Sequence, residues 1–198
     1  MTTNTATADV SSRQGGLGKG INIGIAVSAL VALVGIVLWV MQLSGGLVQT
    51  GMRDLNTWGL YITLFMFFVG LSAGGLIISS VPKALGVKGF GGISKVAIWT
   101  SIVCTVLALI FIVIDMGHPF RAWELFVYSN FSSPLMWDVA VILTYLILSV
   151  VYLWATVSHE KGKVSAVALR VISVIALAVA ILVHSVTAWI FGLQVAHP

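Results

Sequence analysis

One stretch of the sequence gathers most of the side chains that could do chemistry. From Asp115 to Asp138 the chain reads DMGHPFRAWELFVYSNFSSPLMWD, with acids, a histidine and an arginine close together. Carboxylates and imidazoles can accept and return protons, which is the work of general acid–base catalysis. The candidate proton-exchanging groups of this stretch, with the cation that could balance their charge, are Asp115, His118, Arg121 and Asp138.

The same stretch also allows a purely structural interpretation. Two serines could cap the helix that follows, with a proline in its first turn. The aromatic side chains are typical of the belt that forms at a membrane surface. An ionisable group at the edge of an apolar segment, however, tends to mark function, which favours chemistry for Asp115. The residues of the structural interpretation are Ser132, Ser133, Pro134, Trp123, Tyr128 and Trp137.

A polar stripe follows Asp138 along the next apolar segment. Tyr145, Ser149 and Tyr152 come after it at spacings of seven, four and three residues, which places all four on one face of a helix. Such a stripe could carry protons or line a pocket. Hydroxyl groups also hydrogen-bond between membrane helices without further function. Both interpretations of the stripe are open.

His184 is the ionisable group of the last apolar segment, where it shares a helix face with Thr187 and Gln194. We expect it to approach the acids around Asp138. A haem held between helices needs two axial ligands, and no second histidine lies well inside an apolar segment. Cys104 is the single cysteine, so this chain cannot by itself hold an iron–sulfur cluster or a disulfide. No metal site is predicted, and any redox centre would belong to a partner.

Helices inside a membrane must position these groups. The chain has 198 residues, of which 59% are hydrophobic and 8% charged, and its mean hydropathy is +1.09. Soluble domains carry about 25% charged residues, and a helix needs roughly 20 apolar residues to cross a bilayer. The sequence therefore predicts an all-α bundle of five transmembrane helices, at about 21–43, 55–81, 95–115, 135–157 and 168–194.

The basic residues indicate how these helices are oriented. With five crossings, one side of the membrane receives eight Lys and Arg, and the other receives only Arg53 and Arg121. By the positive-inside rule the N-terminus is cytoplasmic and the stretch from 115 to 138 faces outward. Because the basic residues are scattered, the net charge of +4 does not indicate nucleic acid as a partner. Residues 1–20, rich in Thr, Ser, Ala and Gly, predict a flexible tail.

Small residues recur at every fourth position in the first two predicted helices. Gly24, Ser28 and Ala32 align on one face of the first, and Gly70 and Gly74 on one face of the second. Such spacing favours close helix contact in membranes. This pattern predicts packing and carries little functional content.

Several short motifs, in order along the chain, resemble one membrane-protein family. They are N-T-W-G at 56–59, G-L-S-A-G at 70–74, D-x-G-x-P-x-R at 115–121, N-F-S-S-P with W-D at 130–138, and H-S-V-T-A-W at 184–189. Taken together and in this order, they resemble the NrfD/PsrC family, the membrane subunits of polysulfide reductase-like respiratory complexes.

The resemblance implies a subunit without redox centres of its own that binds menaquinone or ubiquinone near the outer side of the bacterial cytoplasmic membrane. It implies electron exchange with an iron–sulfur subunit docked there, itself often joined to a molybdopterin enzyme or a multihaem cytochrome. Family members have eight or more crossings in two four-helix bundles, so this chain corresponds to the N-terminal half, as a fragment or split gene product would, and further membrane helices are expected as partners. The motif positions expected at the quinone are Asn56, Trp58, Gly70, Gly74, Ser132, Ser133 and Trp137.

Three functions fit these residues. The first is a quinone-interacting subunit, inactive alone, that passes electrons to an outward-facing iron–sulfur subunit while Asp115, His118, Asp138, Tyr145 and His184 exchange protons. The second is a membrane anchor without redox chemistry, in which the same residues hold helices together and dock a partner. The third is a proton-conducting subunit that uses the Tyr145 stripe and binds no quinone.

Overall fold

A computed structural model describes residues 4–46, 59–87, 89, 91–117, 119–121, 123–128 and 134–193 of the chain. The described residues are helical apart from short turns. They belong to two compact units, Met1–Gln49 and Thr50–Pro198. The first unit contains helix α1, and the second contains all the other helices.

Helix α1 runs from Asn4 to Gly45, and its part from Gly18 to Gly45 is long and apolar enough to cross a membrane. Apolar side chains lie on all its sides, and Ile25 and Leu33 are more than half exposed. A helix that is apolar all round is suited to lipid. Residues 4–20 are helical, a form that their composition does not predict, and the mobility of this tail stays a prediction.

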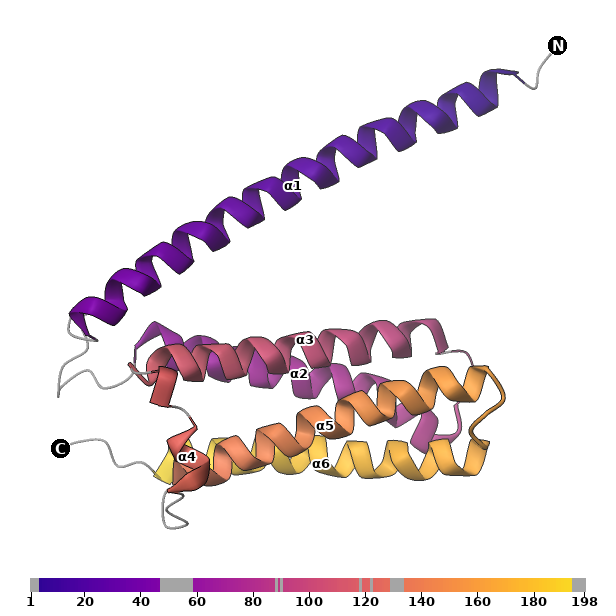
Figure 1. The fold of residues 1–198 in the computed structure, drawn as a ribbon. Helices are drawn as coiled ribbons and strands as arrows, with labels where there is room; N and C mark the ends of the chain where they lie inside the picture. Colours follow the sequence, from indigo (N-terminus) through magenta and orange to yellow (C-terminus); the bar gives the residue numbers. More distant parts are fainter. Residues whose placement is uncertain are drawn as a thin grey trace. The chain divides into compact units, whose positions relative to one another are not determined.

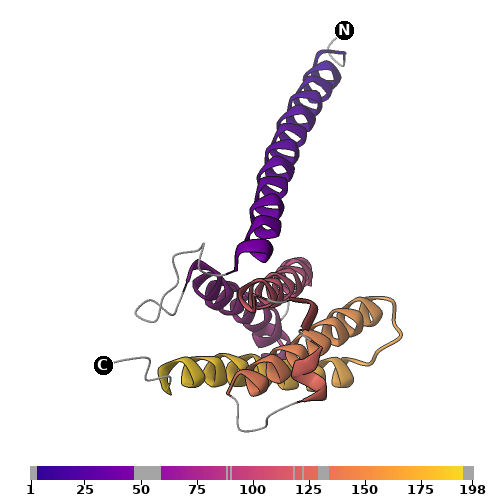
Figure 2. The same ribbon diagram turned by 60° about the vertical axis from the view of Figure 1, so that its left-hand side comes forward.

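Four long helices form the second unit: α2 (Leu60–Leu85), α3 (Gly91–Asp115), α5 (Pro134–Glu160) and α6 (Ala166–Leu193). Helix α2 contacts α3 and α6, while α5 contacts α6 and α3, so that the four helices close a ring. Figures 1 and 2 show the ring as two layers, with the pair α2 and α3 lying against the pair α5 and α6. The interior of this ring positions the candidate site.

The two ends of the bundle differ in chemistry. Between α3 and α5 lie the short turn η2 (Pro119–Arg121) and the short helix α4 (Glu124–Val127), and we call this the loop end. Figure 1 shows α4 beside the start of α5. At the opposite end, where α2 and α5 finish, Lys95 and Arg170 lie near the starts of α3 and α6, and we call it the basic end. That the loop end faces outward stays a prediction.

The five long apolar helices confirm the predicted all-α membrane bundle. Large apolar side chains such as Phe67, Trp99 and Ile147 are more than half exposed on the bundle surface, as suits a surface in lipid. Helix α2 begins at Leu60 and ends at Leu85, later than the predicted 55–81, of which positions 55–58 lie outside the described residues. The candidate spans among the described residues are Gly18–Gly45, Leu60–Leu85, Gly92–Asp115, Met136–Glu160 and Ala166–Gly192.

Helix α2 continues past Pro82, which places Lys83 in the helix rather than in the loop that the sequence predicts. Proline lacks the amide hydrogen of a helix interior and usually ends or bends the helix nearby. Here α2 ends at Leu85, and the next residue, Gly86, has a φ of 73°, in the left-handed region. The amides of Gly86 and Val87 donate to the carbonyls of Lys83 and Pro82 at 3.3 and 2.7 Å, a common way to close a helix. The carboxyl-terminal turn of α2 therefore carries Lys83 toward the bundle.

The tightest contact between α2 and α3 is made at Gly75. A Cβ atom at this position would lie 2.8 Å from the carbonyl oxygen of Ala97. At Gly74, one of the two positions for which the sequence predicts close packing, no atom lies within 4 Å of such a Cβ. The close approach to α3 is thus made at Gly75 rather than at the neighbouring Gly74, which faces open space.

Candidate functional site

A long apolar groove runs along the outer surface of α2 and α3. Its volume is about 850 Å³, and glycines on both helices form part of its wall. The α2 residues that line it run from Met66 to Ile78, a length of about 18 Å at 1.5 Å per helical residue. Among the lining residues only Thr100 and His184 have polar side chains. The Thr100 hydroxyl donates to the carbonyl of Val96 within α3. His184 is therefore the polar side chain of the groove that remains available to a bound ligand.

His184 reaches this groove from α6 because Gly70 has no side chain. A Cβ on Gly70 would lie 3.4 Å from Cε1 and 3.9 Å from Nε2 of the imidazole. The His184 side chain is exposed and makes no hydrogen bond to any residue that the structure describes. Gly70, Gly74 and His184, all expected at the site from the sequence, therefore line one groove.

Asp138 lies inside the bundle, near the start of α5, and is only 1% exposed. Its Oδ1 accepts a hydrogen bond of 2.8 Å from the Thr187 hydroxyl on α6. Thr187 is three residues beyond His184, which places the two on neighbouring turns of the same side of α6. Helix α6 thus presents an imidazole to the groove and, one turn on, a hydroxyl to a buried carboxyl group.

Tyr145 is the centre of a buried hydroxyl cluster formed with Ser72, Ser101 and Thr105, which we call the Tyr145 layer. The Tyr145 hydroxyl donates to the Ser72 carbonyl at 2.9 Å and lies 2.8 Å from the Ser101 hydroxyl. The hydroxyls of Ser72 and Thr105 are 2.6 Å apart. A void of about 10 Å³ borders Ser72, Thr105 and Tyr145, close to the space that one water needs. Three helices are joined by this cluster.

Asp115 ends α3 half buried, and its Oδ1 has no hydrogen-bond partner among the described residues. Arg121, considered as its counter-ion, instead donates from Nε to Glu124 Oε1 at 2.9 Å. This hydrogen bond lowers the pKa of the Glu124 carboxyl group and raises the pKa of Arg121. No described hydrogen bond joins Asp115 to Asp138 or His184.

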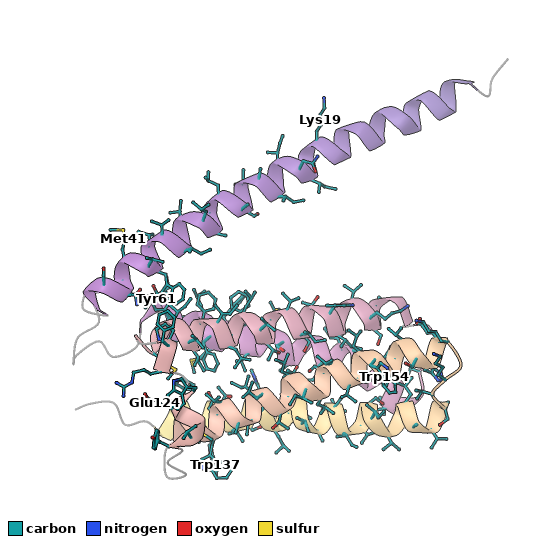
Figure 3. All side chains as sticks on the ribbon, viewed as in Figure 1. Lys19, Met41, Tyr61, Glu124, Trp137 and Trp154 are labelled. Carbon is teal, nitrogen blue, oxygen red and sulfur yellow. The ribbon has the colours of Figure 1, made fainter. Side chains whose placement is uncertain are left out.

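The remaining predicted site residues divide into two groups. Trp137 is 53% exposed, and Figure 3 shows its ring pointing away from the bundle, so it does not line the groove. The predicted residues that lie outside the described part of the chain are Asn56, Trp58, His118, Ser132 and Ser133.

The serines that contact Tyr145 were not predicted from the sequence, although a signal for them exists. On each of three helices a hydroxyl residue recurs after two turns, which keeps both members on one face. Because Tyr145 and Tyr152 share this spacing with serines on α2 and α3, the three pairs could have been matched. The pairs are Ser72 and Ser79, Ser94 and Ser101, and Tyr145 and Tyr152.

The described geometry places an imidazole at an apolar groove. Within the described ranges no group of three His, Cys, Asp or Glu residues could hold a metal ion. His184 can accept or donate a proton at a ring nitrogen that faces the groove. The buried acid Asp138, bonded to Thr187, lies one turn of α6 away.

Comparisons with known proteins were made for the whole chain. The family model described as Polysulphide reductase, NrfD matches residues 48–198. A Halobacterium salinarum protein, provisionally named as a dimethyl sulfoxide reductase membrane subunit, is 38% identical over 208 residues, covering 96% of this chain and 47% of the relative. A selenate reductase subunit of Mesobacillus selenatarsenatis is 33% identical, covering 69% of this chain and 32% of the relative.

A third relative is the Hdr-like menaquinol oxidoreductase integral membrane subunit of Archaeoglobus fulgidus. It is 26% identical over 168 residues, covering 85% of this chain and 41% of the relative. No solved structure matches the chain. The chain thus spans less than half the length of each of these relatives. Because the family model covers the whole of the four-helix unit, the chain belongs to the polysulphide reductase NrfD family, as the motifs of the sequence predict.

Proposed function

We propose that this chain is the quinone-interacting membrane subunit of a multi-subunit respiratory oxidoreductase in a bacterial cytoplasmic membrane. In this role it passes electrons between menaquinone or ubiquinone and an iron–sulfur subunit at the loop end. The names of its relatives, which are subunits of reductases and of a menaquinol oxidoreductase, support a partner-dependent role.

The groove with His184 is the observation that carries this proposal. Ligand sites are typically clefts of about 300–1,000 Å³ with apolar walls and a few polar groups. The groove has about 850 Å³, is apolar along α2 and α3, and offers one imidazole. A quinone joins a ring with two carbonyl oxygens to a long apolar tail, so both of its parts find a matching surface.

The chain's own residues would hold the quinone and handle its protons. The apolar walls formed by α2 and α3 would bind the tail, and His184 would hydrogen-bond a ring oxygen. A bound quinone supplies two-electron, two-proton redox chemistry. His184 would take or return a proton at a ring nitrogen, and the Asp138–Thr187 pair on the next turn of α6 would hold a second proton inside the bundle.

The electrons require a partner subunit. The single cysteine, Cys104, is buried and cannot assemble an iron–sulfur cluster alone. We assign the clusters to a ferredoxin-like subunit, joined to a molybdopterin or multihaem cytochrome subunit. Further membrane helices would complete the membrane part of the complex, because the chain spans less than half of its relatives' length.

Two substitutions in the purified complex test the proposal. His184→Ala removes the imidazole, and Gly74→Leu fills the groove at a position where no neighbouring atom lies within 4 Å. We expect quinol-linked turnover per assembled complex to fall at least tenfold in each, which corresponds to about 1.4 kcal/mol of transition-state stabilisation. Partner activity with artificial electron donors should persist.

Matched controls lie on α6 outside the groove. Ser185 is exposed and, among the described residues, bonds only to the carbonyl of Ile181, and none of their atoms lies within 4 Å of a Cβ on Gly192. Ser185→Ala and Gly192→Leu should leave turnover unchanged. Normal turnover per complex in His184→Ala, accompanied by a lower yield of assembled complex, would instead support the membrane anchor.

A further inference from the structure

Lys83 places an amino group inside the bundle that the quinone chemistry does not use. It lies half buried in the last turn of α2, and its Nζ donates to the Thr156 hydroxyl on α5 at 2.8 Å. The same Nζ lies 4.7 Å from the centre of the Tyr152 ring. At this basic end Glu160 pairs with Lys95 at 2.7 Å. Lys83 therefore has no salt bridge within the described part of the chain.

A second buried hydroxyl cluster, the Tyr152 layer, consists of Tyr152, Ser79 and Ser94. The Tyr152 hydroxyl donates to the Ser79 carbonyl at 3.0 Å and accepts from the Ser79 hydroxyl at 3.3 Å. The hydroxyls of Ser79 and Ser94 are 2.6 Å apart. Lys83 Nζ lies over the ring of Tyr152, so the charged group borders this layer, while its described hydrogen bond goes to Thr156.

The Tyr152 layer, the Tyr145 layer and the Asp138–Thr187 pair follow one another along the bundle. Asp138, Tyr145 and Tyr152 are seven residues apart on α5, about 10 Å for each step at 1.5 Å per residue. The void beside Tyr145 is also bordered by Ile142 and Val183, which lie between Tyr145 and the Asp138–Thr187 pair on α5 and α6. One water there would extend the Tyr145 layer toward Asp138.

An apolar barrier separates the two hydroxyl layers. Leu76 and Ile98 come between them on α2 and α3, and both are fully buried. Ser149, at the same level of α5, donates its hydroxyl to the backbone carbonyl of Tyr145 at 2.8 Å. Protons cannot cross this level along the described hydrogen bonds, so passage requires water between Leu76 and Ile98.

Interhelical hydrogen bonding alone would account for the two layers but not for Lys83. A lysine near a helix end normally extends its amino group to water. Burying that group has a cost in free energy, because water solvates the ammonium better than a hydroxyl and a ring do. The charged neighbours at this end, Lys95 on α3, Glu160 on α5 and Arg170 on α6, are all bonded elsewhere, and Glu160 and Arg170 are exposed.

We propose that Lys83 is the inlet of a proton path from the basic end to the Asp138–Thr187 pair. The path runs through the Tyr152 and Tyr145 layers, and Leu76 with Ile98 forms its barrier. This inference rests on the proposed function, because the path supplies or drains protons at the quinone site.

The proton balance needs no further reactant. For each proton that the Lys83 ammonium gives to the hydroxyl chain, water at the basic end returns one. Each hydroxyl accepts a proton on one side and releases one on the other. Two such protons accompany the two electrons that the partner delivers in quinone reduction, and quinol oxidation runs the same transfer in reverse.

The first test measures protons per electron with the complete complex in sealed vesicles. Lys83→Gln keeps a donor to Thr156 but cannot titrate, and Tyr152→Phe removes only the hydroxyl. In both we expect the number of protons exchanged at the basic end, per electron, to fall at least twofold. The controls, Lys95→Gln at the same end and Thr144→Val on the exposed side of α5, should keep the parent ratio. A parent ratio in Lys83→Gln would overturn the proposal.

The second test does not depend on quinone and separates the two proposals. Leu76→Asn or Ile98→Asn should let water into the barrier, so that an imposed membrane potential drives protons at least tenfold faster through vesicles carrying the complex. Adding Lys83→Gln should abolish this leak. If neither barrier variant leaks, or if the leak persists without Lys83, the path is refuted even where quinone turnover is intact. A leak that depends on Lys83 would support the path even if quinone turnover failed.

Discussion

Two aspartates near the loop end illustrate how differently the bundle treats a carboxyl group. Asp138 is fully enclosed and accepts a hydrogen bond from Thr187, so part of its burial cost is offset. Asp115 is only half buried, yet its Oδ1 has no partner among the described residues. The buried Oδ1 of Asp115 therefore has no described hydrogen bond to offset its burial, whereas Asp138 is part of the helix packing.

The bond between Asp138 and Thr187 should be measurable as a coupling energy. Thr187→Val keeps the shape of the side chain and removes the hydroxyl, and Asp138→Leu keeps about the size of the acid and removes both oxygens. In a double-mutant cycle we expect the two to couple by about 0.6 kcal/mol and by no more than about 1.7 kcal/mol, the average and the maximum found for hydrogen bonds between membrane helices. Unfolding in detergent measures the four stabilities. Pairing Asp138→Leu with Ser185→Ala should give additive effects, and equal additivity with Thr187→Val would contradict the bond.

The helices themselves were readily predicted from the sequence, because long uncharged runs can only be satisfied by helices in lipid. The rotation of each helix about its own axis, which decides the residues that face a neighbouring helix, was not predicted. The groove exists because Gly74 faces outward while Gly75 meets Ala97, and the spacing of small residues does not distinguish one neighbour from the other. The position of Lys83 was missed because Pro82 suggests the end of the helix, whereas α2 ends three residues later at Leu85.

Adjacent glycines on α2 give a direct test of that rotation. Gly75→Ala would place a methyl group 2.8 Å from the Ala97 carbonyl, so the helices must separate, at a cost of about 1–3 kcal/mol in unfolding free energy. Gly74→Ala meets no neighbour and should be neutral or slightly stabilising, because alanine favours helix more than glycine does. Thermal unfolding of the two variants compares them. An equal loss of stability in both variants would mean that α2 is rotated about its axis relative to the described structure.

For the whole molecule, composition and motifs predicted the membrane bundle and the family, and both predictions are confirmed. Orientation depends on which loops collect positive charge and stays a prediction. The serine partners of Tyr145 could have been matched by their two-turn spacing, but only the packed bundle shows which helices face one another.

The predicted orientation can be read by labelling from one side of the membrane. Lys161 lies at the basic end and Tyr128 at the loop end, and both are exposed. In a Cys104→Ser background, Lys161→Cys should react with an impermeant thiol reagent only from the cytoplasmic side, and Tyr128→Cys only from the outside. Reaction of both positions from the same side would refute the positive-inside assignment.

The buried thiol of Cys104 can report how often the bundle opens. It is the single sulfhydryl of the chain, and it is 5% exposed within α3, beside the Tyr145 layer residue Thr105. A lipid-soluble alkylating agent can reach it only when α3 swings away from its neighbours. The alkylation rate of Cys104 therefore measures how often the four-helix ring opens at α3. Slower alkylation of Cys104 upon addition of a quinone would indicate that the bound molecule holds α2 and α3 together. The native thiol would report this lower frequency of opening without any engineered label.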